Sequence, residues 1–119
     1  MEGHLTIKID GKDVPMFFGN YALEETLAHF DVSISDIGDL LQKKLLPFMR
    51  VFIYHAAAYP ILKDRGIPEF TEFDIHTWID ENGGANGELM IQCSKEAFRC
   101  LGLTSSEPDE KKRTLKKSA

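Results

Sequence analysis

The chain has 119 residues, of which 43% are hydrophobic and 28% charged, and its formal net charge is −5 at pH 7. This composition indicates an ordinary globular protein that is large enough for one domain with a core of its own. Residues 104–119 hold five basic and three acidic side chains, so residues 1–103 carry a net charge of −7. An acidic body argues against sequence-independent binding of nucleic acid, which depends on Lys and Arg side chains.

The N-terminal residues predict a β-hairpin. Polar and apolar side chains alternate over residues 4–10, as in a half-buried strand. Asp10-Gly11 is a typical two-residue hairpin turn, and a return strand is predicted over residues 14–18. Pro15 cannot donate a backbone hydrogen bond, so we expect this strand at the edge of the sheet or at a bulge.

Two helices are predicted after the hairpin. We expect Asn20 to cap the first, which spans residues 21–30. The pattern Ser33-x-x-Asp36 resembles a capping box and is expected to begin the second.

The stretch Leu45–Leu62 is the most apolar part of the chain and predicts a central helix. From Val51 to its end no side chain carries a full formal charge, and apolar side chains point in all directions around the helix. Such a helix is normally buried, so the other elements are expected to surround it. Pro47 suits its first turn, Pro60 is expected to kink or end it, and Gly66 is expected to be its left-handed cap.

The same stretch is the only membrane candidate in the sequence. It is shorter than the roughly 20 residues that a transmembrane helix needs, and it contains Arg50 and His55. No basic and then apolar leader opens the chain. We therefore expect a cytoplasmic protein without membrane contact.

Two more helices are predicted in the C-terminal half. Thr71-x-x-Asp74 is a second capping-box pattern, a glycine-rich loop occupies residues 82–87, and a last helix over residues 88–101 ends at Gly102. Over residues 104–119 the composition becomes charged, which predicts a disordered tail.

Together these elements predict a mainly α chain of the α+β class. A small N-terminal β-hairpin precedes about five helices that pack around the central apolar helix. Residues 1–103 form a single domain, and residues 104–119 form the charged tail.

The sequence offers little that would support catalysis or metal binding. The four histidines lie on different predicted elements without the spacing of a metal site. Cys93 and Cys100 lie seven positions apart on one predicted helix, too far for a disulfide, so we expect two reduced thiols. We expect no enzyme activity, no metal and no cofactor. A small enzyme or metal protein that uses His55, His76 or Cys93 is the least favoured alternative.

The chain is rich in aromatic residues, with eight Phe, three Tyr and one Trp. A generously packed core would account for them, and so would an exposed surface for a partner. If a partner surface exists, we expect aromatic residues outside the central helix to form it. The candidates are Phe17, Phe18, Phe70, Phe73 and Trp78.

The layout also resembles a known family. After the strand pair comes the segment Phe18-Gly-Asn-Tyr-Ala-Leu23, followed by the capped second helix and the central apolar helix. The segment Phe70-Thr-Glu-Phe-Asp-Ile-His-Thr-Trp-Ile-Asp80 comes next. This order resembles the tail assembly chaperones of long-tailed bacteriophages. The resemblance covers residues 4–103. It rests on layout and length and not on a catalytic motif.

The resemblance implies binding and not catalysis. Proteins of this family hold the hydrophobic tape-measure protein soluble while tail-tube subunits polymerise around it. It therefore implies the tape-measure protein and the tail-tube protein as partners, in the cytoplasm of the host, with several copies of the chain acting together as a homo-oligomer. The alternative is a small helical adaptor or scaffold protein that binds one folded partner.

Overall fold

The computed structural model describes residues 3–103, and the predicted tail lies outside them. Strands β1 (His4–Ile9) and β2 (Lys12–Phe17) form an antiparallel hairpin in which His4 pairs with Phe17 and Ile9 with Lys12. Asp10 and Gly11 both have positive φ, at 53° and 78°, as a two-residue type I′ turn requires. The predicted hairpin and its turn are therefore confirmed.

Helix α1 (Asn20–Phe30) follows the hairpin directly. The expectation that Asn20 caps it is wrong, because Asn20 is its first residue and its side-chain amide donates to the Glu24 carboxylate at 2.7 Å. Gly19 takes the cap position. A Cβ atom on Gly19 would lie 2.3 Å from the Phe17 ring, so a larger residue here would force that ring to move.

Helix α2 (Ile37–Lys63) joins the predicted second and central helices, after a 3₁₀ turn η1 (Ile34–Asp36). The only non-helical residue inside α2 is Lys44, with φ −141° and ψ 45°. It lies just before Pro47, whose ring would clash with the Lys43 carbonyl in a straight helix. The described residues therefore contain four α-helices where about five were predicted.

The C-terminal end of α2 differs from the prediction at its cap. Pro60 does not end the helix, which continues for three residues because only one backbone hydrogen bond is lost there. The left-handed residue is Arg65, with φ 66°, and not Gly66. The Gly66 N–H donates to the Ile61 carbonyl at 2.8 Å and Arg65 N–H to Leu62 at 2.9 Å, which is the Schellman arrangement.

Helices α3 (Glu72–Glu81) and α4 (Glu88–Cys100) complete the fold, with a 3₁₀ turn η2 (Gly84–Asn86) between them. The predicted capping box of α3 is confirmed. The Thr71 hydroxyl accepts from the Asp74 N–H at 3.3 Å, and the Asp74 carboxylate accepts from the Thr71 N–H at 2.8 Å. Gly102 ends α4 in the left-handed region as predicted, with φ 77°.

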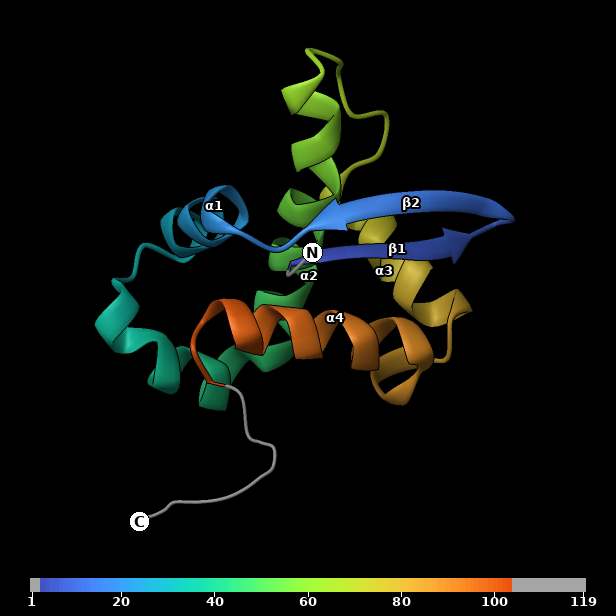
Figure 1. Ribbon diagram of the computed structural model, residues 1–119. Coiled ribbons are helices and arrows are strands. Elements are labelled where there is room, and N and C mark those ends of the chain that lie inside the picture. The colour runs from blue at the N-terminus through green and yellow to red at the C-terminus, as the bar shows by residue number, and fades with distance from the viewer. Residues whose placement is uncertain (1–2, 104–119) are drawn as a thin grey trace.

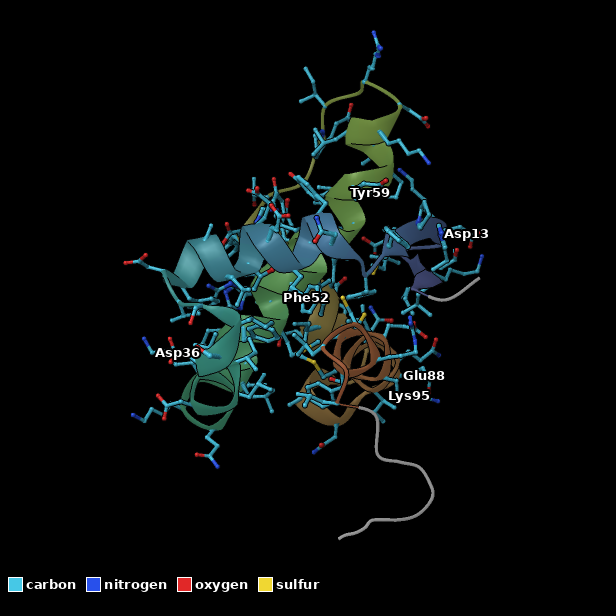
Figure 2. All side chains as sticks on the ribbon, turned by 60° about the vertical axis from the view of Figure 1, so that its left-hand side comes forward. Asp13, Asp36, Phe52, Tyr59, Glu88 and Lys95 are labelled. Atoms are coloured by element: carbon cyan, nitrogen blue, oxygen red, sulfur yellow. The ribbon has the colours of Figure 1, made fainter. Side chains whose placement is uncertain are left out.

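The core lies around the part of α2 that follows Lys44. In Figure 1 the hairpin, α1, α3 and α4 surround this part, and its last turns project beyond the hairpin. Figure 2 shows Phe52 in the interior, whereas Asp13, Asp36 and Glu88 lie at the periphery. The predicted central helix is confirmed by its fully buried side chains, which are Phe48, Met49, Val51, Phe52, Ile53, Ala56, Ala57 and Ala58.

Among residues 3–103, one helical segment, Ile34–Lys63, is long and apolar enough to cross a membrane. Within its most apolar window 44% is buried inside the protein. The core helix of a soluble protein meets the same criterion, so this segment is weak evidence for a membrane span.

Candidate functional site

The five aromatic residues predicted to bind a partner occupy three different environments. Phe18 is only 2% exposed and packs edge-on against Phe52, so it belongs to the core. Phe70 and Trp78 are half-buried and in contact, with ring centroids 5.0 Å apart. Phe17 is half-buried on the hairpin, and Phe73 is 73% exposed. Of these five residues, the structure brings only Phe70 and Trp78 into direct contact with each other.

A cavity of about 300 Å³ lies between α2, α3 and the start of α4, close to Phe73. The Phe73 ring lies 5.6 Å from the ring of His76, which lines the cavity. We call this space the α2–α3 cavity. Its lining residues are Leu46, Pro47, Arg50, His76, Ile79, Asp80, Ala85 and Met90.

Residues next to the kink in α2 form one wall of the cavity. Pro47 begins the regular part of the helix, so Leu46 lies in the turn beside the break and is 54% exposed at the surface. Ile79 of α3 and Met90 of α4 provide apolar surface deeper in the cavity, where Met90 is buried and Ile79 is half-buried. The cavity therefore has apolar side chains both inside and at its opening.

The polar groups of the cavity are few and nearly balanced in charge. Arg50 provides one positive charge and Asp80 one negative charge. Arg50 Nη1 lies 3.5 Å from His76 Nε2, a long hydrogen bond. No nucleophile lines this cavity. An arrangement of this kind can hold apolar groups and orient them by a few polar contacts.

Sequence reasoning found only part of this cavity. Ile79 and Met90 lie on the two C-terminal helices that were predicted to pack around the central helix. Leu46 could not be separated from the rest of the apolar stretch, because only the break at Lys44 turns it toward the surface. The one available signal was Pro47, which predicted a helix start at this point.

A second feature is a row of aromatic rings across α2. Successive ring centroids in this row are between 5.0 and 6.0 Å apart. We call it the aromatic row. Its members are Phe17, Tyr59, Tyr21, His55, Tyr54, Phe70 and Trp78.

His55 lies in the middle of the aromatic row and has one ring nitrogen without a polar partner. Its Nδ1 atom is buried and has no hydrogen-bond partner in the structure. Burial lowers the pKa of His55, and the carboxylates of Glu25 and Glu72 act in the opposite direction. Burial also raises the pKa of Tyr21, and the Glu25 charge adds to this effect. These shifts place both carboxylates in the electrostatic surroundings of the row.

The residues of the least favoured alternative occupy separate surroundings. Cys93 is buried with its Sγ atom 3.9 Å from Met16 Sδ, and burial raises the pKa of its thiol to about 12. Such a thiol is not a nucleophile near neutral pH. His55 belongs to the aromatic row and His76 to the α2–α3 cavity. Within residues 3–103, no group of three or more His, Cys, Asp or Glu side chains could hold a metal ion.

Comparison of the chain with models of protein families, with curated proteins and with solved structures gives no match.

Proposed function

We propose that this chain is a non-catalytic binding protein that covers an apolar helical segment of a partner. One observation carries the proposal: the α2–α3 cavity is lined mainly by apolar side chains, and exposed Leu46 and Phe73 lie at and beside its opening. Large apolar side chains at the surface beside an apolar cavity are typical of a protein-binding site.

The occupant that fits this cavity is an amphipathic or apolar helix. Such a helix presents side chains three and four positions apart, and one or two of them would enter the cavity beside Ile79 and Met90. Leu46 and Phe73 would cover the helix from either side. Arg50 and Asp80 supply a donor and an acceptor at the same place, which can align the polar edge of the bound segment.

Within this class of proteins, we propose a tail assembly chaperone of a long-tailed bacteriophage. The resemblance of residues 4–103 to that family supports this choice. The exposed apolar side chains at the α2–α3 cavity support it as well. The partner would be the tape-measure protein, which is hydrophobic and helical, and tail-tube subunits would replace the chaperone as they polymerise. Several copies of the chain would cover one such partner in the cytoplasm of the host.

A direct test uses a synthetic Leu- and Ala-rich helical peptide as the client. Light scattering of the peptide is followed with and without the protein, and we expect the protein to suppress aggregation. Leu46→Glu should abolish most of this effect, because burying one leucine contributes roughly 1.5–3 kcal/mol and its loss lowers affinity by about tenfold to a hundredfold. Ile91→Glu is the matched control, since Ile91 is 49% exposed on α4 and does not line the cavity.

Two outcomes separate the levels of the proposal. If the wild-type protein leaves peptide aggregation unchanged and binds one folded protein instead, the adaptor alternative holds. If the peptide is protected but the coding region lies in no cluster with a tape-measure gene downstream and a tail-tube gene upstream, the binding function stands and the phage assignment fails.

A further inference from the structure

The negative charge of the protein is concentrated on two helices. Together α1 and α3 carry six acidic residues and no lysine or arginine. The other described residues hold nine acidic and nine basic side chains, so they are balanced. The net charge of residues 3–103 is therefore located on α1 and α3 alone.

These two helices meet beside the aromatic row. His29 Nδ1 of α1 lies 3.8 Å from Glu72 Oε2 of α3, which shows that the end of one helix approaches the start of the other. Among the described residues, neither Glu25 nor Glu72 forms an ion pair with a lysine or arginine. Their charges act on His55, which lies between the two helices on α2. Apart from the His29 contact of Glu72, these carboxylates therefore have no basic partner among the described residues.

The rings between the carboxylates complete the surface. Tyr54 contacts both His55 and Phe70, and Tyr21 contacts His55 from the side of α1. All four rings are only half-buried. Aromatic faces next to carboxylates attract lysine and arginine side chains through cation–π contacts and charge pairing. We call this surface the acidic seam, formed by Tyr21, Glu25, Tyr54, His55, Phe70 and Glu72.

The chain itself contains a segment of complementary charge. Five of its fourteen lysine and arginine residues lie within residues 111–117, at positions Lys111, Lys112, Arg113, Lys116 and Lys117. The same seven residues contain no acidic side chain, and Leu115 is their one apolar side chain. The segment therefore combines the charge that the acidic seam lacks with one group that can contact an aromatic ring.

The length of chain after Leu103 is sufficient for this contact. Eight residues lead to Lys111 and fourteen to Lys117, which at about 3.3–3.6 Å per residue span roughly 26–29 Å and 46–50 Å. The described part measures 45 × 30 × 27 Å. A tether of this length lets the segment reach much of the surface of its own chain and keeps it at a high effective concentration there.

We propose that the basic segment 111–117 docks on the acidic seam of its own chain. The docked segment neutralises Glu25 and Glu72 and covers the rings of Tyr21 and Tyr54. Because the seam and the α2–α3 cavity share no residue, this contact is independent of the proposed client binding.

Paramagnetic NMR on the full-length chain tests this contact. A spin label is attached at Ser118→Cys in a Cys100→Ser background, where the remaining Cys93 is buried and does not react. We expect the amide signals of α1 around Glu25 and of α3 around Glu72 to broaden several-fold more than those of the hairpin turn. The difference should disappear at 1 M salt, where the Debye length falls to about 3 Å.

Charge-reversal variants identify the partner surface. Glu25→Lys together with Glu72→Lys should remove the selective broadening, while the control pair Asp13→Lys and Glu88→Lys changes net charge equally and should retain it. Should the double variant fail to fold, replacing the five basic residues by serine provides the same test from the other side. Uniform broadening would overturn the proposal. So would broadening that appears only when spin-labelled chains are mixed with chains that carry no spin label, because the contact would then lie between two chains.

Discussion

The two parts of helix α2 on either side of Lys44 share a helical backbone but differ in how deeply their side chains are buried. Before the break only Leu40 is fully buried, whereas eight side chains are buried after it. The first part lies at the surface beside α1, and the second is surrounded by the hairpin, α1, α3 and α4 except at its last turns (Figure 1). Two helical segments joined at one break can thus supply both the core of a protein and, at the break, an apolar surface.

The largest expected effect comes from the core part. Phe52→Ala should lower the free energy of unfolding by about 3–5 kcal/mol, because the large side chain is fully buried and leaves a cavity. Leu45→Ala, at a residue that is 41% exposed next to the break, should cost less than about 1 kcal/mol. Urea denaturation measures both. Equal losses would contradict the division of α2 into two parts.

The pH dependence of the free energy of unfolding tests the second part of α2 at His55. Burial lowers the pKa of folded His55 below the 6.5 of an ordinary histidine. The unfolded chain therefore binds more protons between the two pKa values, so stability is complete above pH 6.5 and declines as the pH falls through the folded pKa. Glu25, Glu72 and His29 are the charged or titratable groups that act on His55.

The measurement is the denaturation midpoint of the wild type and of His55→Gln between pH 5 and 8. The variant should lose part of the decline toward acid. A decline that is identical in both proteins would show that another group causes it.

The smallest effect concerns the break itself. Pro47→Ala restores a backbone donor and removes the clash with the Lys43 carbonyl, so Lys44 should adopt helical φ and ψ. The carbon chemical shifts of Lys44 report this change directly. Stability should change by less than about 1 kcal/mol, because the core part of α2 is not altered. If the shifts of Lys44 remain non-helical, tertiary packing and not the proline causes the break.

The predictions from sequence succeeded where a local pattern decides the structure. The Asp10-Gly11 turn, the Thr71 capping box and the Gly102 cap each depend on a few neighbouring residues, and each is found as expected. The left-handed cap of α2 marks the limit of such patterns, because Arg65 occupies it and not the predicted Gly66. There the hydrogen bonds of Arg65 to Leu62 and of Gly66 to Ile61 place Arg65, and not the glycine, in the left-handed position.

The candidate site depends on contacts between distant segments, and the sequence predicted less of it. Phe18 and Phe73 look equally apolar in the sequence, but one packs on Phe52 and the other is exposed beside His76. No local pattern separates them, because Phe18 lies between β2 and α1 while Phe73 lies on α3, and the packing of the whole protein decides which side chain is buried. Leu46 was missed for the same reason.

The most direct test of the account is client protection by wild type, Leu46→Glu and Ile91→Glu, measured side by side by light scattering of the apolar helical peptide. All three proteins should have nearly the same unfolding free energy, within about 0.5 kcal/mol, because both residues are exposed at the surface. The account predicts that only Leu46→Glu loses protection. Equal protection by both variants, or equal loss, would show that the α2–α3 cavity is not the binding site.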